Sequence, residues 1–348
     1  MKRLIIFLIL LGLFAGNMIF SQEEAETLID FTEIVKNVKL EDQSEENKET
    51  LVYFGDEAGV GITEEIRNKM FASLVMDNWR VTLASSARTP SRQRMCMAKT
   101  VYTKKRGDSG AMENDVPVLG VRVKFPDGNF NSYALIEPPF EIQAYQPLHK
   151  EISGDTITKG DLQDDEADYK GSKFDNKGVL KNVGTIKSIS AEIYGANYPH
   201  GFGVIIVDEN YAERIYHLGY LNYEGWQTRT WENNNYITDV RDRELKQYPL
   251  YPRAVPYIKL LGFVVFRDAA TLGGDFITYI KNVTVVYDDA VLEREDEEIT
   301  HELEWGIIQN RNEKRRKVEY QRLGSRMLLE VMEKQKTVDA KKEQDATQ

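Results

Sequence analysis

Apolar and polar residues alternate with a period of two through much of the middle of the chain. Val121, Val123 and Phe125 are separated by two basic residues, the pattern of a strand with one face against a core and the other in water. A Pro-Asp-Gly sequence at 126–128 follows directly and is typical of a turn. The pattern therefore predicts an antiparallel strand that ends at Phe125.

Similar short runs continue almost to residue 290 and predict further strands. They are rich in β-branched and aromatic residues and are separated by turn residues: Tyr133–Glu137, Phe140–Tyr145, Ile189–Ile193, Gly203–Val207, Arg214–Leu221, Trp226–Trp231, Ile258–Phe266 and Phe276–Tyr287. Many short strands without intervening long helices favour a mainly β fold with an antiparallel β-sandwich or jelly-roll-like body. Two tandem sandwiches are the alternative.

Two other segments depart from this alternation. Residues 150–181 are rich in glycine and acidic residues and predict a long surface loop or a link between two sheet-forming halves. An apolar patch at Leu28–Val38 lies in an otherwise polar, acidic stretch. We expect this patch to form a helix or an edge strand.

From Leu292 onward the pattern changes to that of a helix. Apolar residues such as Leu303, Ile307 and Leu323 recur at helical spacing, and proline is absent. We expect an amphipathic helical tail whose apolar stripe lies on the sandwich or against another subunit. A basic run lies within this tail and is formed by Arg311, Lys314, Arg315, Arg316 and Lys317.

The first 21 residues have the organisation of a secretory signal peptide. Lys2 and Arg3 precede the apolar run Leu4–Phe14, and small or polar residues follow up to Ser21. The apolar run is shorter than the roughly 20 residues of a spanning helix, which favours cleavage over anchoring. We therefore expect export to the periplasm and no membrane association after cleavage.

These boundaries divide the chain into four parts. We expect a signal peptide at 1–21, an acidic N-terminal segment at 22–50, the β-sandwich body at 51–290 and a charged helical tail at 291–348. Residues 22–65 contain 14 acidic and three basic residues, whereas residues 311–348 contain 11 basic and seven acidic ones. An acidic beginning and a basic end allow head-to-tail contact between copies, or docking on a charged partner, although two solvated ends are the alternative. The net charge of −11 argues against nucleic-acid binding.

The sequence contains no recognisable catalytic or metal-binding motif. The histidines, His149, His200, His217 and His301, lack zinc-ligand spacing, and glycine motifs for phosphates or dinucleotides are absent. The acidic cluster at 164–168 lacks the spacing of an EF-hand. Cys96 is the only cysteine, so no intrachain disulfide forms, and we expect it to be a half-buried apolar residue. We predict neither enzyme activity nor a cofactor.

An aromatic cluster suggests an alternative function. Its rings lie close together in the sequence, at Tyr194, Tyr198, Phe202, Tyr220, Tyr223, Trp226 and Trp231. Exposed on a β-sandwich they would stack on sugars, whereas buried they would be ordinary core, which is the favoured interpretation. The alternative function is that of a soluble periplasmic carbohydrate-binding module.

A resemblance to a known family is carried by blocks of residues in a fixed order. The blocks are Val121–Pro126, Lys187–Gly195, Tyr220–Trp226, Tyr257–Asp268, Gly273–Phe276 and Tyr279–Asp288. Together with the signal peptide, they resemble the spirochaete periplasmic flagellar filament outer-layer (sheath) protein family, FlaA, over roughly residues 70–290.

This resemblance implies a structural function. Members of the family coat a flagellin core in the periplasm and influence filament stiffness, shape and motility. The implied partners are core flagellin subunits and other copies or paralogues of the sheath protein. Glycans on the core would be a further partner if the core flagellin is glycosylated, in which case the carbohydrate-binding alternative is compatible with this function. The basic run is the expected partner-facing element, and reversing Arg315 and Arg316 to glutamate is expected to weaken co-sedimentation with filaments.

Overall fold

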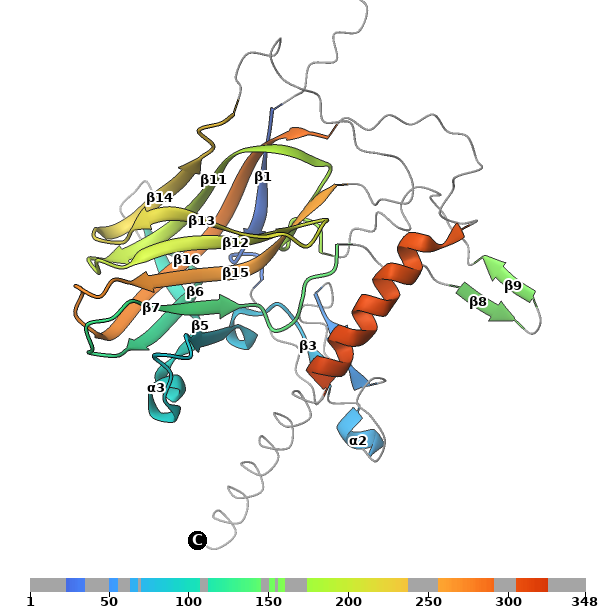
Figure 1. The fold of residues 1–348 in the computed structure, drawn as a ribbon, viewed down its shortest axis with the longest axis horizontal. Coiled ribbons are helices and arrows are strands. Elements are labelled where there is room, and N and C mark those ends of the chain that lie inside the picture. The colour runs from blue at the N-terminus through green and yellow to red at the C-terminus, as the bar shows by residue number, and fades with distance from the viewer. Residues whose placement is uncertain are drawn as a thin grey trace, which may run out of the picture.

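The computed structural model describes ten stretches of the chain. They are residues 23–34, 50–55, 63–67, 70–106, 112–144, 150–153, 156–159, 174–236, 256–290 and 305–324. The expected signal peptide at 1–21 and the acidic cluster at 164–168 lie outside these residues. The described strands form a sandwich of two antiparallel sheets, shown in Figure 1.

The first sheet is built around β16 (Gly274–Asp289), the longest of the described strands. Its order is β14 (Glu224–Glu232), β11 (Val183–Ala196), β16, β6 (Met112–Phe125) and β5 (Met97–Arg106). A further strand, β1 (Glu23–Asp30), pairs with the second half of β16. The apolar patch at Leu28–Val38 therefore begins in an edge strand, and its residues 35–38 lie outside the described chain.

The second sheet is built around β15 (Tyr257–Arg267). Its order is β13 (Glu213–Tyr220), β12 (Gly201–Asp208), β15, β7 (Ser132–Glu137) and β4 (Arg80–Leu83), and β10 (Val179–Lys181) also pairs with β15. Smaller elements are the pairs β2 (Val52–Tyr53) with β3 (Phe71–Ala72) and β8 (Lys150–Ser153) with β9 (Thr156–Lys159), the short helices α2 (Glu64–Arg67) and α3 (Pro90–Met95), and the 3₁₀ turn η2 (Met76–Asn78).

One hydrophobic core lies between the two sheets. On β11 and β16, alternate residues such as Ile189, Ile193 and Val283 are fully buried, because successive side chains of a strand point to opposite faces. From the second sheet, Phe263 stacks on Phe202 with ring centroids 5.8 Å apart. The expected mainly β, antiparallel sandwich is confirmed.

Residues 138–144 alternate between apolar and polar positions like a strand but do not form one. Residues 138–144, which include most of the strand expected at Phe140–Tyr145, have no strand pairing among the residues that the structure describes. Pro138 and Pro139 fix the backbone and lack an N–H for a ladder. Phe140 and Ile142 are nevertheless buried in the core, which explains why this irregular segment has the alternating pattern of a strand.

One end of the sandwich is closed by a buried arginine. The side chain of Arg267, which is 1% exposed, donates hydrogen bonds to the carbonyl oxygens of Gly128, Phe130 and Thr271 at 2.8, 3.2 and 2.7 Å. These bonds tie the loop after β6 to the loop after β15. The two loops are thus fixed by a cation that the chain itself fully encloses.

A buried histidine packs at the same end. The ring of His200 lies 4.8 Å from that of Phe276 and 5.1 Å from that of Phe125. Burial, with a smaller contribution from the nearby Arg267 charge, lowers the pKa of His200 from 6.5 to about 4. The imidazole is therefore neutral in the folded protein at neutral pH.

Candidate partner-binding site on the C-terminal helix

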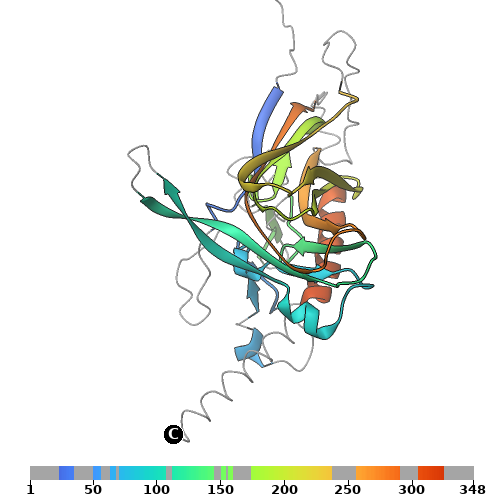
Figure 2. The same cartoon turned by 90° about the vertical axis from the view of Figure 1, so that its left-hand side faces the viewer.

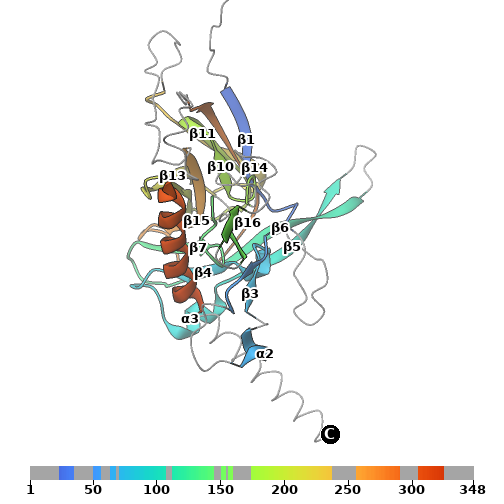
Figure 3. The ribbon, with the colours of Figure 1, turned by 90° about the vertical axis from the view of Figure 1, so that its right-hand side faces the viewer.

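The tail forms a helix over residues 307–324, which we call the C-terminal helix. Two of its apolar residues, Ile308 and Leu323, are buried, and Figure 3 shows the helix running along the second sheet past β13, β15, β7 and β4. The ring of Tyr320 contacts that of Phe54 edge-on, with centroids 4.9 Å apart. Of the two expected arrangements, the described part of the tail adopts the one that packs on its own sandwich. None of the described helices is long and apolar enough to cross a membrane.

A second contact of the helix is made through Tyr211, in the turn between β12 and β13. The guanidinium of Arg315 lies 3.2 Å from the ring centroid of Tyr211, and the ammonium of Lys259 lies 5.0 Å from the same centroid. A cation over an aromatic face is attracted by the ring quadrupole. Partial burial lowers the pKa of Arg315, although the guanidinium stays charged at any physiological pH. Tyr211 therefore joins the helix to the sheet.

A cavity of about 590 Å³ lies between the helix and the second sheet. Its lining has both signs of charge and includes Arg80, Glu137, Glu213, Lys259, Glu319 and Arg322. Two of the cations are paired locally, Lys259 with Glu141 at 2.5 Å and Arg322 with Glu319 at 2.6 Å. The helix therefore contacts the body both through charged residues around this cavity and through Leu323, which belongs to the hydrophobic core.

The basic residues of the helix fall into two groups. Arg311, Lys314 and Lys317 are exposed and are not among the residues that line the cavity. Arg315 contacts Tyr211, and the guanidinium of Arg316 lies 6.0 Å from the ring of Tyr320. The exposed side also includes Val318, which is 67% exposed. Within the expected partner-facing run, the first group is available to another molecule, whereas Arg315 and Arg316 contact rings of their own chain.

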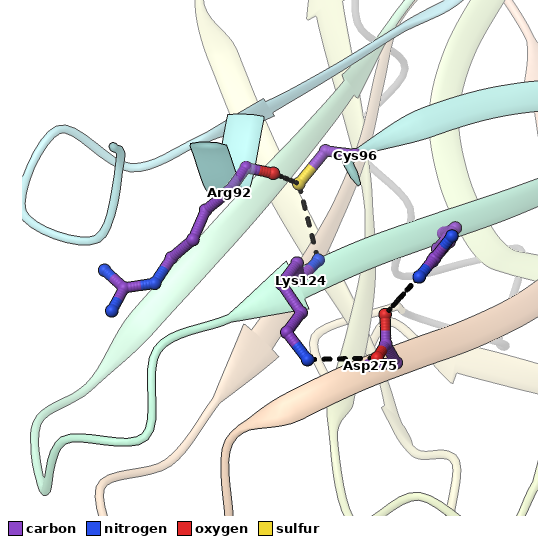
Figure 4. Close-up of polar contacts among 5 residues, drawn as sticks. Arg92, Cys96, Lys124 and Asp275 are labelled. Carbon is purple, nitrogen blue, oxygen red and sulfur yellow. Dashed lines mark hydrogen bonds and ion pairs between the residues drawn. The ribbon is translucent and has the colours of Figure 1, made fainter. Parts of the chain in front are cut away.

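Cys96 does not have the surroundings of a reactive thiol. Figure 4 shows its sulfur between the backbone of Arg92 and that of Lys124. The thiol donates to the carbonyl oxygen of Arg92 at 3.3 Å and accepts from the N–H of Lys124 at 3.4 Å. Burial raises the pKa of the Cys96 thiol, which disfavours the nucleophilic thiolate. The nearby carboxylate of Asp275 instead pairs with Lys124 at 3.0 Å and with Arg122 at 2.8 Å on the outer face of the sheet.

The other candidate chemistry is dispersed. Among the described residues, no three His, Cys, Asp or Glu side chains come together in a way that could hold a metal ion. His200 is buried between aromatic rings, and His217 is exposed beside Tyr220 at 5.7 Å. His149 and His301 lie outside the described chain.

The aromatic cluster separates into different environments. Phe202 is fully buried in the core, and Trp231 packs on Tyr216 with ring centroids 4.6 Å apart. The half-buried Trp226 instead contacts Tyr194 on the outer face of the first sheet, at 5.6 Å. The rings therefore do not form one platform, and most of them contribute to packing.

Sequence patterns do not identify Tyr211 or Lys259 as site residues. Lys259 is a single charge in an apolar strand, and its 4% exposure is the kind of burial that requires a partner. Tyr211 has no such signal, since a tyrosine in a turn is common. Only the fold brings the two side chains to the same helix.

The fold and the site define a class of protein: a rigid β-sandwich with an exposed basic helix surface. A model of the flagellar filament outer layer protein family, FlaA, matches residues 43–296. Proteins named flagellar filament outer layer protein are similar over most of the chain. The one from Spirochaeta aurantia is 38% identical, covering 97% of this chain and 93% of the relative, and that from Treponema pallidum is 35% identical, covering 90% and 89%. The chain belongs to this family, which confirms the resemblance and supports a structural function in a filament outer layer.

Solved structures add little to this conclusion. A carbohydrate-binding module in complex with β-1,4-galactotriose is 9% identical, with a TM-score of 0.24 over 60% of this chain and 88% of that one. A second set of carbohydrate-binding modules from the β-sandwich superfamily has a TM-score of 0.26 over 60% of this chain and 56% of that one. Overlaps of this size carry no argument about ligands.

Proposed function

We propose that the protein is a structural subunit of the sheath around a periplasmic flagellar filament. It is exported by the signal peptide at 1–21, coats the flagellin core and influences filament stiffness, shape and motility without catalysing a reaction. The observation that carries this proposal is membership of the outer layer family over residues 43–296. A sandwich with one continuous core supplies the rigid body that a coat subunit needs.

Within this function, the exposed basic group of the C-terminal helix is the surface that meets an acidic partner in the filament. Arg311, Lys314 and Lys317 are exposed together, and the helix that carries them is held on the body by Tyr320 and Leu323. A charged surface on a fixed element attracts an oppositely charged partner over about a Debye length, and this attraction weakens as the salt concentration rises.

Co-sedimentation with filaments stripped of their outer layer tests this function. The mature protein should pellet with the filaments, and the variant Lys314→Glu/Lys317→Glu should pellet several-fold less, with a difference that shrinks as salt is raised. Arg315 is left unchanged because it contacts Tyr211. The matched control is Arg88→Glu/Arg94→Glu, the same charge change at two exposed residues elsewhere.

The outcomes separate the two parts of the proposal. Unmodified protein that stays in the supernatant would contradict the sheath function. Normal pelleting of Lys314→Glu/Lys317→Glu would leave the sheath function in place and overturn the assignment of the contact to the basic helix surface.

A further inference from the structure

The turn between β12 and β13 holds Tyr211 in an unusual backbone conformation. Its φ of 61° lies in the left-handed region, which bulky side chains rarely adopt. In the described chain, the other non-glycine residues with positive φ are all asparagines, Asn176, Asn182 and Asn197, and asparagine tolerates this conformation. Tyrosine therefore occupies a position where the backbone favours glycine or asparagine.

The hydrogen bonds of the turn do not require a tyrosine. The N–H of Asp208 donates to the carbonyl oxygen of Ala212 at 3.3 Å, and the N–H of Tyr211 donates to the carbonyl oxygen of Asp208 at 2.9 Å. The carboxylate of Asp208 accepts from the N–H groups of Asn210 and Ala212, both at 2.9 Å. Hairpin loops of this length commonly end in a left-handed residue, for which glycine is the usual choice. Asparagine at 211 could keep all of these bonds, so the reason for the ring lies outside the turn.

The contacts of the Tyr211 ring supply that reason. The guanidinium of Arg315 lies 3.2 Å and the ammonium of Lys259 lies 5.0 Å from its centroid. Glu141 pairs with Lys259, and its charge opposes the lowering of the Arg315 pKa by burial. Without the ring, two cations would share this one carboxylate. The attraction of both cations to the ring therefore offsets the cost of the left-handed backbone.

Arg315 is well placed to fix the helix on the body. It lies seven residues after the buried Ile308 and eight before the buried Leu323, and spacings of two turns put all three on the same side of a helix. The two apolar residues are about 22 Å apart at 1.5 Å per residue. Figure 2 shows the helix on the side of the molecule away from β1. Tyr211 thus supports the helix midway between its two apolar contacts.

We propose that Tyr211 is a positioning residue for the C-terminal helix, and that the β12–β13 turn adopts its left-handed conformation to bring the ring to Arg315. The contact fixes the middle of the helix. It thereby sets the orientation in which the exposed Arg311, Lys314 and Lys317 are presented by the body. This inference concerns the free protein and goes beyond the sheath function.

Native-state hydrogen exchange of the full mature chain, without filaments, tests the proposal. The variant Tyr211→Asn permits the left-handed conformation but lacks the ring. Protection of the helix amides over residues 311–320 should fall roughly fivefold. Protection of the β12 and β13 amides should be equal or higher, because backbone strain in the turn is released. A ring that only packs against the turn would not separate the helix from the strands in this way.

Two further variants identify the cause of the loss. Tyr211→Phe is the matched control, since it keeps the aromatic face and the strain, and it should retain the helix protection of the unmodified protein. Arg315→Gln should lower helix protection as Tyr211→Asn does and leave that of β12 and β13 unchanged. Unchanged helix protection in Tyr211→Asn, or a joint loss in the helix and both strands, would overturn the proposal. Because no filament is used, neither outcome bears on the sheath function.

Discussion

Two buried cations of the sandwich have different surroundings. Arg267 is 1% exposed and bonds three carbonyl oxygens of loops from the body itself. Lys259 is 4% exposed but lines a cavity of about 590 Å³, where it shares Tyr211 with Arg315 of the C-terminal helix. The body alone thus supplies the acceptors for two guanidinium nitrogens of Arg267. The tail, in contrast, contributes to the surroundings of Lys259.

This difference indicates which part of the molecule is able to rearrange. Detaching the helix would open a cavity that already has charged residues in its lining, which costs less than opening a wholly apolar core of similar area. Opening the loops around Arg267 would leave a charge and several carbonyl groups without partners. The loop end is therefore expected to behave as part of the rigid body, and the helix as the element that adapts to the filament.

The largest effect is expected from Arg267→Met. Removing the guanidinium leaves the carbonyl oxygens of Gly128, Phe130 and Thr271 without their donor, at a cost of about 3 to 5 kcal/mol in the free energy of unfolding. Urea denaturation measures this loss. The control is Arg122→Met, which removes a half-exposed arginine paired with Asp275 and should cost at most about 1 kcal/mol. Equal losses of unfolding free energy in the two variants would show that the bonds of Arg267 contribute no more to stability than the ion pair of Arg122.

A pH-dependent effect is expected at the same end. Because the pKa of His200 is lowered to about 4, the unfolded chain binds its proton near pH 6.5 while the folded chain does not. Stability contributed by the neutral imidazole is complete above pH 6.5 and is lost as pH falls toward 4, by about 2 to 3 kcal/mol.

Replacing this histidine by phenylalanine removes the titrating group. His200→Phe fits a pocket already formed by Phe125 and Phe276, so the variant should fold and lose less stability than the unmodified protein between pH 7 and 4. Urea denaturation at both pH values gives the difference. His217→Phe, at an exposed position, should retain the original pH dependence. An identical slope in His200→Phe and the unmodified protein would contradict the assignment.

The strands of the body could be predicted from the sequence because the alternation of apolar and polar residues follows from burial of one face of each strand. Ile189 and Ile193 alternate with polar residues since one face of β11 is core and the other is solvent. The same reasoning predicts a strand at Phe140–Tyr145 wrongly, because an irregular segment can bury alternate side chains too. It also predicts the helical tail, whose described part is helical over 307–324.

The site and the strand order of the sheets depend on contacts between distant segments. The contact between Tyr211 and Arg315 joins residues that are far apart in the sequence, and no periodicity encodes such a contact. Along one edge of β16, β6 pairs through Leu119–Phe125 and β1 pairs from Asn282 onward. The alternating pattern at Val121–Phe125 predicts the strand β6, but it does not predict where the pairing of β6 with β16 ends.

The smallest effect is expected for the contact between Arg315 of the C-terminal helix and Tyr211 of the body. A double-mutant cycle between Arg315→Gln and Tyr211→Leu should give a coupling of about 0.5 to 1 kcal/mol, the range of a partly exposed cation–π pair. The reason is that Arg315 is the described basic residue of the helix nearest a ring of the body, at 3.2 Å from the Tyr211 centroid. Urea denaturation of the two single variants and the double variant measures it. The control cycle pairs Tyr211→Leu with Lys317→Gln, at an exposed residue of the same helix, and should give no coupling. Zero coupling in both cycles would mean that the helix is held by its apolar residues alone, and a coupling above about 2 kcal/mol would make the helix side as firmly fixed as the loop end.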